Sequence, residues 1–454
     1  MMGSPLPPNF TLQWNPSTSS YREGTILIGG SPLRMMRLAP TGAAVVTRWR
    51  DGDAVGVHGT LARRLTAAGI FEPLAPHGHS ASVTVVIPVY NNPTGLEASL
   101  HGITHPVIVV DDGSINDQAT AISDVCARHN VKLVRCAKNC GPASARNVGW
   151  RHAASDLVLF LDSDANCPPL TIRRLVDHFA DHDVVAVAPR IASSAAASDV
   201  SRIARYETAH SPLDLGAQSA SVKPLSRVAY VPSTCLMVRR KALEAVGGFD
   251  EQLRFGEDVD LVWRLSETGI IRFDAAVVAH HDHPTTFGAM IKRRVGYGSS
   301  AAALDRKHPT LVAPSNCSPY TAGAWLAVAA GHPAVGLATM VGSAAMLPKK
   351  LKDLPPQAAW KLAITGHLKA WKMFTSATRR AWLPMAVAAA IPNRNARRWL
   401  ALSLLSAGPL TVASDAAYCV GVYKGCWRER SWRAILPKLS SWPPRPTTLS
   451  PATK

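Results

Sequence analysis

The sequence lacks the features of a disulfide-linked, zinc-binding or secreted protein. Its eight cysteines show no CxxC spacing, so we expect reduced thiols rather than a disulfide framework or a zinc site. The residues around Pro5, Pro7 and Pro8 do not form the apolar core of a signal peptide. We therefore expect the chemistry of this chain to face the cytoplasm.

Acidic residues are also in short supply, with 31 Asp and Glu against 49 Lys and Arg, a formal charge of +18. Nucleic-acid binding would require basic residues interleaved with exposed aromatic residues in a defined module. Here the basic residues instead flank apolar segments in the last third of the chain: Lys349, Lys350, Lys352, Arg379, Arg380, Arg394, Arg397 and Arg398. This pattern favours contact with the cytoplasmic face of the cell membrane and no nucleic-acid partner.

Two apolar segments, 321–347 and 399–423, are long enough to cross a bilayer. The first is interrupted by His332 and Pro333, the second by Pro409 and Asp415, and both are only mildly hydrophobic. Segment 358–374 has the pattern of an interfacial helix. Each of these segments is equally compatible with a buried helix of a C-terminal helical domain.

Short apolar runs earlier in the chain predict an α/β fold. Segments 83–89 and 107–110 are rich in β-branched residues, as buried parallel strands are, and 93–102 can form the helix between them. The first run delivers Pro88 and Tyr90 to its carboxyl end, and the second delivers Asp111 and Asp112. In doubly wound sheets ligands bind at this edge, so Asp111 and Asp112 can contact a nucleotide or, alternatively, cap the next helix.

A third apolar run, 159–161, leads into Asp162 and Asp164. Side chains alternate along an extended segment, so both carboxylates point the same way and provide hard oxygen ligands for Mg²⁺ or Mn²⁺. Segment 139–150 breaks at Gly141 and carries Arg146 and Asn147 toward the same edge, where Arg146 can pair with a phosphate. This arrangement predicts a metal-assisted sugar transfer.

Downstream, 247–251 forms a turn and 255–265 an amphipathic helix that begins with Glu257 and Asp258. These carboxylates can simply complement the helix dipole. A sugar hydroxyl needs a base to accept its proton, however, and we assign that role to Asp258 of the Glu257–Asp258 pair.

Segments 83–91, 108–114, 139–149, 159–164 and 247–265 resemble, in order and spacing, the motifs of the inverting glycosyltransferase family 2, which has the GT-A nucleotide-diphospho-sugar transferase fold. The resemblance implies nucleotide binding by Asp111 and Asp112, metal and diphosphate binding by Asp162 and Asp164, and Asp258 as the general base. It also implies a histidine ligand, for which His281 and His283 are equal candidates. Arg293 and Arg294 can neutralise the departing diphosphate. The Gln, Arg and Trp pattern of the processive branch is absent.

The first eighty residues differ in character. The pattern GGSPLRMMRLAPTGAAVV, followed by LARRLTAAGIFEP, resembles the small winged-helix PqqD-like domains that bind precursor peptides. An ordinary docking domain is the alternative. A PqqD-like head joined to a family 2 domain is similar to the glycosyltransferases of the mycofactocin system, which implies UDP-glucose as donor, a peptide-derived redox cofactor precursor as acceptor, an oligoglucose product and other mycofactocin maturation proteins as partners.

The length of 454 residues allows about three domains. We predict a disordered N-terminus (1–20), a PqqD-like domain (21–80), a GT-A domain (81–310), a helical, basic and apolar membrane-associated region (311–436) and a disordered tail (437–454). The alternatives are a transferase for a cell-envelope or lipid-linked sugar and a non-catalytic peptide-binding scaffold.

Overall fold

The structure, a computed structural model, describes residues 3–194 and 201–440. The chain forms two compact units, residues 1–287 and 288–454. The prediction of a boundary near residue 310 is therefore wrong. Helices that we placed at the end of the GT-A domain pack in the second unit, where Ala301 and Ala302 share an apolar cluster with Val422 and Cys426.

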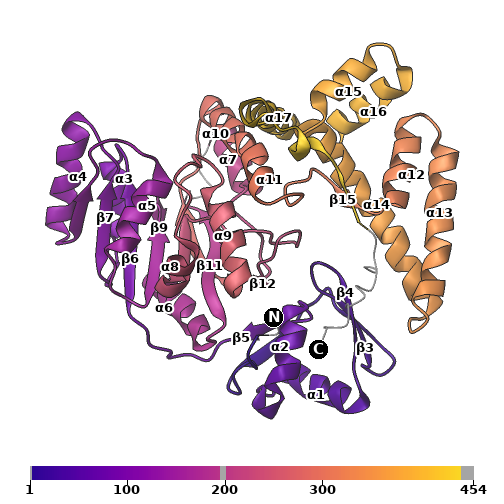
Figure 1. The fold of residues 1–454 in the computed structure, drawn as a ribbon, viewed down its shortest axis with the longest axis horizontal. Helices are drawn as coiled ribbons and strands as arrows, with labels where there is room; N and C mark the ends of the chain where they lie inside the picture. The colour runs from indigo at the N-terminus through magenta and orange to yellow at the C-terminus, as the bar shows by residue number, and fades with distance from the viewer. Residues whose placement is uncertain (1–2, 195–200, 441–454) are drawn as a thin grey trace, which may run out of the picture. The chain divides into compact units, whose positions relative to one another are not determined.

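A nine-stranded mixed sheet forms the centre of the first unit, in the order β10-β14-β11-β13-β9-β6-β7-β8, with β12 paired to β14 (Figure 1). Strand β6 pairs parallel with β7 and β9, and β7 pairs parallel with β8. Strand β13 runs antiparallel to both β9 and β11. The strands are β6 (Val83–Val89), β7 (Val107–Asp111), β8 (Lys132–Arg135), β9 (Leu157–Leu161), β10 (Ala165–Asn166), β11 (Val184–Ser193), β12 (Ala220–Ser221), β13 (Cys235–Arg239) and β14 (Ile270–His281).

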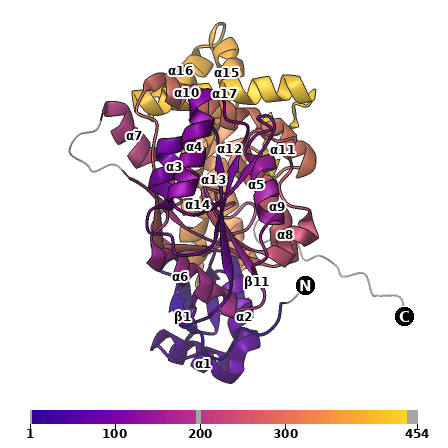
Figure 2. The ribbon, with the colours of Figure 1, turned by 90° about the vertical axis from the view of Figure 1, so that its left-hand side faces the viewer.

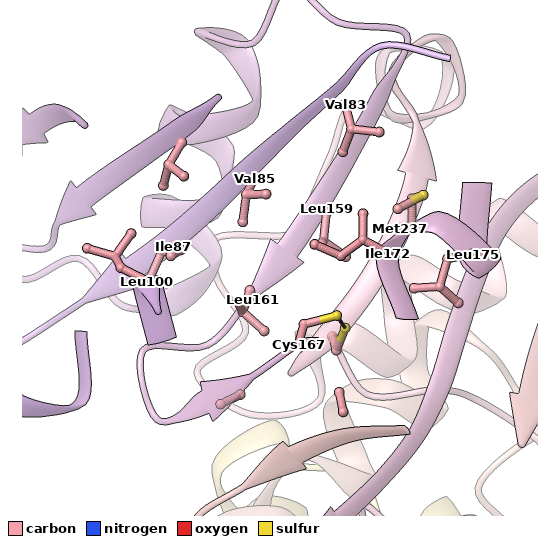
Figure 3. Packing of buried hydrophobic residues seen from close by; sticks show 14 of the residues in the cluster. Val83, Val85, Ile87, Leu100, Leu159, Leu161, Cys167, Ile172, Leu175 and Met237 are labelled. Carbon is pink, nitrogen blue, oxygen red and sulfur yellow. Dashed lines mark hydrogen bonds between the residues drawn. The ribbon is translucent and has the colours of Figure 1, made fainter. Parts of the chain in front are cut away.

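Helices cover both faces of this sheet, so its central strands are buried on both sides. One cluster joins Val85, Leu159 and Ile172 with neighbours from the helices on the same face (Figure 3). A second cluster joins Val86, Phe160 and their helical neighbours on the other face. The helices of the first face are α3 (Pro93–Leu100), α4 (Asn116–Arg128) and α6 (Pro169–Asp177); those of the second are α5 (Pro142–Arg151), α8 (Arg240–Val246) and α9 (Glu257–Thr268), while α7 (Arg202–His210) lies between β11 and β12 in the chain.

The N-terminal part of the first unit is a small α/β domain, here called the head (residues 3–75). Its sheets are β2-β3-β4 and β1-β5, and its core contains Phe10, Leu12, Trp49 and Phe71. Its elements are β1 (Thr11–Trp14), β2 (Ser19–Tyr21), β3 (Ile26–Gly29), β4 (Arg34–Arg37), α1 (Pro40–Arg50), α2 (Gly59–Ala67) and β5 (Phe71–Leu74).

The prediction of disorder over 1–20 is wrong for the residues that the structure describes. Strand β1 pairs antiparallel with β5, with Thr11 opposite Leu74 and Trp14 opposite Phe71. Leu6 and Phe10 are each only 1% exposed. Burial of these apolar side chains ties the segment to the head, even though its prolines give it the composition of a loop.

The head docks on the end of the central sheet through a buried ion pair. Arg63 of α2 donates two hydrogen bonds to Asp181, of 2.7 and 2.6 Å, and both side chains are at least 95% buried. Figure 2 shows the head beside α6 and β11, the strand that begins just after Asp181. The head and the domain of the central sheet thus form one compact unit.

The second unit is helical. Its elements are α10 (Phe287–Ser299), α11 (Ala301–Lys307), α12 (Pro319–Ala329), α13 (Pro333–Lys350), α14 (Pro356–Arg380), α15 (Leu383–Ala390), α16 (Arg394–Leu405) and α17 (Pro409–Glu429), with a short parallel pair of β15 (Asn316–Cys317) and β16 (Lys438–Leu439).

The apolar segments predicted from the sequence are divided among several of these helices. Segment 321–347 breaks at Gly331 into α12 and α13, and 399–423 is split between α16 and α17. No single helix among residues 3–194 and 201–440 is long and apolar enough to cross a membrane; α16 and α17 pass that test only as a pair, bent by 114°. Of the predicted tail, 437–440 contains β16, and 441–454 lies outside the described residues.

Candidate active site

Three sequence motifs meet around Arg146 at the carboxyl edge of the central sheet. Arg146 lies on α5 and donates one hydrogen bond to Asp162 Oδ1, directly after β9, at 2.6 Å. It donates a second to Glu257 Oε1, at the start of α9, at 3.0 Å. The guanidinium also lies over the ring of Phe249, 5.4 Å from its centroid. The expectation that these motifs share one edge agrees with this geometry, but Arg146 contacts carboxylates of the chain itself.

The charges of this cluster depend on each other. Arg146 is only 4% exposed, and burial alone would lower its pKa, but Asp162 and Glu257 raise it above its usual range. Burial, and then the neighbouring charge of Asp258, raises the pKa of Glu257, while Arg146 opposes the rise. A buried guanidinium requires such partners because an uncompensated charge is very costly in the interior.

Asp258 is half-buried at the N-terminal end of α9. Its Oδ1 accepts a hydrogen bond from the backbone N–H of Val259 at 2.8 Å. Burial raises the pKa of Asp258, and the charge of Arg146 opposes the rise. A carboxylate with a raised pKa is a better proton acceptor than an ordinary surface aspartate, so this position suits a general base.

Asp164 and His281 are the predicted metal ligands that the structure brings together. Strand β10 pairs with β14 so that Ala165 lies opposite His281, and Asp282 N–H donates to Asp164 O at 3.1 Å. This pairing leaves His281 Nε2 at 3.4 Å from Asp164 Oδ2. His281 is 3% exposed, and its Nδ1 has no hydrogen-bond partner among the described residues.

These two side chains are a suitable donor pair for a divalent cation, because one carboxylate oxygen and one imidazole nitrogen already face each other. The ring of His283 lies 5.5 Å from that of His281, between centroids. Asp162 is held by Arg146 instead. Within the described ranges no group of three or more His, Cys, Asp or Glu side chains is arranged to hold a metal ion. The set of ligands therefore remains a prediction.

Asp111 and Asp112 both accept hydrogen bonds from other groups of the protein. Asp111 is fully buried and accepts hydrogen bonds from Ser114 N–H at 2.8 Å and Arg135 Nε at 3.0 Å. Asp112 accepts from the N–H groups of Cys140 and Gly141, at 2.9 and 2.8 Å, and burial raises its pKa. The capping alternative is wrong, because α4 begins after Ile115 with no side-chain cap. Nucleotide binding by this pair stays a prediction.

Asn147, which α5 brings to the same edge, makes its hydrogen bonds within the protein, and donor binding by this residue stays a prediction. The residue is 1% exposed, and its Nδ2 donates to Phe249 O at 2.8 Å and Glu251 Oε1 at 2.9 Å. Its Oδ1 accepts from Phe249 N–H and Trp150 Nε1. Asn147 is thus occupied in holding the turn that leads to α9, because a buried amide must satisfy its hydrogen bonds internally.

The other predicted donor contacts differ in accessibility. Pro88 is buried within β6, whereas Tyr90 is 45% exposed just beyond that strand. Arg293 and Arg294 lie on α10 of the second unit, where Arg294 is buried and donates from Nε to Ser414 Oγ at 2.9 Å. The roles assigned to Arg293 and Arg294 remain predictions.

The sequence analysis missed Arg135, which holds the buried Asp111. Its Nη2 also donates to Ala119 O at 2.7 Å and Ser123 Oγ at 3.0 Å, so it joins β8 to α4. A basic residue at the end of a short strand carries no local signal of this role. Only the parallel pairing of β7 with β8, which sets Asp111 opposite Arg135, reveals it.

Comparisons with known proteins identify a family and several similar chains. The family "Glycosyl transferase family 2" matches residues 84–247. The pre-mycofactocin glycosyltransferases of Mycobacterium tuberculosis strains CDC 1551 / Oshkosh and ATCC 25618 / H37Rv are 36% identical over 475 residues, covering 97% of this chain and 100% of theirs. The dolichol-phosphate mannosyltransferase of Pyrococcus furiosus is 29% identical over 115 residues, 24% of this chain and 33% of its own. A mannosyltransferase from Pyrobaculum calidifontis, solved with GDP-Man and Mn²⁺, has a TM-score of 0.44 and 18% identity, covering 78% of this chain and 90% of that one.

The sheet, its two helical layers and the acidic edge define a glycosyltransferase with the GT-A fold. Because the Mycobacterium tuberculosis relatives match over their whole length, the chain belongs to the pre-mycofactocin glycosyltransferases of family 2.

Proposed function

We propose that this enzyme transfers glucose from UDP-glucose, with inversion, to a hydroxyl group of pre-mycofactocin, the peptide-derived redox cofactor precursor, and extends it to an oligoglucose chain. The name of its full-length relatives supports the acceptor. The observation that carries the site is the double hydrogen bond of Arg146, which joins the acidic end of β9 to the Glu257–Asp258 pair. Donor sugar and chain growth rest on the family resemblance.

In the proposed reaction Asp258 is the general base. Its carboxylate accepts the proton of the acceptor hydroxyl while that oxygen forms a bond to the anomeric carbon of the sugar. The bond from this carbon to the diphosphate breaks at the same time, and UDP leaves with the electron pair. A single displacement inverts the anomeric configuration and needs no covalent intermediate with the enzyme.

The other acidic residues prepare this step. Arg146 holds Glu257 and Asp162 in place and opposes the rise in the pKa of Glu257, whereas Asp258 forms no side-chain ion pair with the described residues. Asp164 and His281 would hold a divalent Mn²⁺ or Mg²⁺ ion, with Asp162 nearby. Such an ion, when bound, neutralises charge on the diphosphate.

Replacement of Asp258 tests the assignment of the base. We expect Asp258→Asn to abolish UDP release from UDP-glucose in the presence of pre-mycofactocin, because the amide cannot accept the proton. The affinity for UDP-glucose, measured by calorimetry, should stay within about twofold of the wild type, since Asp258 is assigned no donor contact. Glu267→Gln, which removes an exposed carboxylate from the same helix, is the matched control and should retain full activity. Retained turnover in Asp258→Asn would show that another group is the base.

Product mass distinguishes the acceptors. A hexose increment on pre-mycofactocin supports the proposal, and successive increments support the oligoglucose chain. If UDP release does not depend on this precursor but increases with a lipid acceptor, the function is instead sugar transfer in envelope synthesis. Asp164→Ala and His281→Ala should each weaken metal-dependent UDP binding, and unchanged binding in both would refute the proposed ligands.

A further inference from the structure

The charge of the chain is divided between its two units. Residues 288–454 contain 23 Lys and Arg but only 4 Asp and Glu, a formal charge of +19. Residues 1–287 contain 26 basic and 27 acidic residues and are close to neutral. The excess of positive charge therefore belongs to the helical unit and not to the unit that contains the candidate active site.

Exposed apolar side chains are concentrated in the same unit. Of the 25 large apolar side chains that are exposed in the described part of the chain, 18 lie after residue 287. Single exposed apolar residues are normal, but a concentration of this kind marks an interaction surface. Positive charge and apolar exposure together restrict the partner that such a surface can have.

Helix α13 shows the pattern most clearly. It has no charged residue from Pro333 to Leu347, and Val335, Leu337, Val341 and Met346 are between 44 and 62% exposed. Together with the exposed Ala334, Ala338 and Ala345, these residues cover about half of the circumference of the helix, and we call this broad exposed face the stripe. The stripe continues into the exposed Lys349 and Lys350, one turn beyond Ala345 and Met346.

Helices α15 and α16 repeat this arrangement. Met385, Val387 and Ile391 are 46 to 76% exposed on and just after α15. On α16, Arg394, Arg398 and Leu402 follow each other at four-residue intervals, and Leu405 is 82% exposed at the end of the helix. A basic end again adjoins an apolar one.

Helix α14, for which the sequence suggested interfacial contact, is held differently. Its Trp371 packs against Trp325 and Trp399, with ring centroids 5.4 and 5.5 Å apart, and Phe374 is 9% exposed. The core-packing alternative therefore applies to these two aromatic residues. Ile364 and Leu368 of α14 are nevertheless 47 and 62% exposed, so α14 adds to the exposed apolar surface that α13, α15 and α16 carry.

We propose that α13, α15 and α16 bind the surface of an anionic membrane. Their exposed apolar residues would lie in the acyl boundary, and their basic ends would lie among the phosphate headgroups. A lipid surface is the partner that offers both an apolar layer and a negative potential over the length of a helix. Peripheral binding agrees with the finding that no single described helix is suited to span a bilayer. The proposal is independent of the sugar and acceptor assigned to the active site.

Vesicle sedimentation of the full-length enzyme tests the proposal. We expect the protein to pellet with vesicles of phosphatidylcholine and phosphatidylglycerol in equal amounts, and much less with phosphatidylcholine alone. Leu337→Glu/Val341→Glu should lower the partition coefficient at least about tenfold, since two charges would enter the acyl boundary. Lys349→Gln/Lys350→Gln should lower it by roughly fivefold per charge, and only with anionic vesicles.

Val57→Glu is the matched control, because Val57 is 94% exposed in the head. This variant should pellet like the wild type. Equal pelleting of Leu337→Glu/Val341→Glu and Val57→Glu, or no pelleting of the wild type, would overturn the proposal. The proposal would also be overturned if the wild type does not bind vesicles but forms a concentration-dependent dimer that Leu337→Glu/Val341→Glu abolishes. In that case a second copy of the chain would cover the stripe. UDP release by the variants without lipid shows whether they are folded and keeps this test separate from that of the active site.

Discussion

At the scale of single residues, Arg146 has the largest influence on the candidate site. Within the described part of the chain, it is the cation that forms ion pairs with both Asp162 and Glu257, which lie 16 and 111 residues further along the sequence. Without it, two acidic groups and Asp258 would face each other at a poorly solvated edge. The pKa values of Glu257 and Asp258, which burial already raises and Arg146 opposes, would rise further, and the ionised form of Asp258 needed for catalysis would be lost.

We expect Arg146→Met to lower the free energy of unfolding by about 3–5 kcal/mol, because it leaves a buried carboxylate without its partner. Arg146→Lys should recover part of the stability but little of the activity, since one ammonium cannot hold both carboxylates in fixed directions. Thermal unfolding and UDP release measure the two effects. Arg151→Met, on the exposed side of the same helix, should cost less than about 1 kcal/mol. Similar losses in both arginine variants would argue against a special role for Arg146.

Glu72, at the contact between the head and the catalytic domain, gives a pH dependence of stability. Burial raises its pKa to about 7, while Arg272, 3.7 Å away, opposes the rise. In the unfolded chain the carboxyl ionises near its ordinary value. The folded state therefore holds an extra proton between these pH values, and stability falls as pH rises through that window.

We expect the free energy of unfolding to decrease by up to about 3 kcal/mol between pH 4.5 and 7 from this group, and to change little from it above pH 8. Glu72→Gln should remove that part of the slope, as measured by urea unfolding at a series of pH values. Glu97→Gln, at an exposed ion pair of the catalytic domain, is the control. The same slope in wild type and Glu72→Gln would show that Glu72 does not titrate in this window.

At the scale of secondary structure, helix α17 crosses the end of α10 at very short range. A Cβ atom built on Gly421 would lie 2.2 Å from the backbone O of Val295 and 2.9 Å from Gly298 Cα. One built on Gly425 would lie 2.5 Å from Ser299 O. Only residues without a side chain permit this approach, so the crossing depends on the four-residue spacing of these glycines.

Gly421→Ala should destabilise the second unit by more than about 2 kcal/mol, because the backbone on the other side of the contact cannot move away cheaply. Gly366→Ala provides the contrast, since no atom lies within 4 Å of a Cβ there and α14 is helical at that position. It should be neutral or stabilise by up to about 1 kcal/mol. Differential scanning calorimetry would compare them, and equal effects would contradict the close crossing.

Local sequence patterns predict some elements well and others poorly. The prediction of a strand over 83–89 matches β6, and the apolar run before Asp162 matches the end of β9. The apolar stretch 228–238, in contrast, forms a strand only from Cys235, which continues to Arg239, because Pro232 has no N–H to donate to a ladder. Strand β1 was missed since its partner β5 lies some sixty residues away, and pairing at that distance leaves no local pattern.

At the scale of the whole chain, composition indicates the class of each region but not the limits of the compact units. The acidic edge could be predicted because parallel strands deliver their carboxyl ends to one side. The internal roles of Asn147 and Arg135 could not, since they depend on contacts between distant segments. In the same way, nothing near Arg63 in the sequence indicates that its partner is Asp181, 118 residues away.

That pair allows a test of whether the head and the catalytic domain unfold together. We expect Arg63→Met to lower stability by about 3–5 kcal/mol, because Asp181 would be left charged and buried. Arg64→Met, at the exposed neighbouring position, should change it by less than about 0.5 kcal/mol. In hydrogen exchange, Arg63→Met should reduce protection in both β5 and β11, since the ion pair joins the domains that contain them. Loss confined to the head would show that it folds and moves independently of the catalytic domain, and that its docking through Asp181 is dispensable for the sheet that carries the active site.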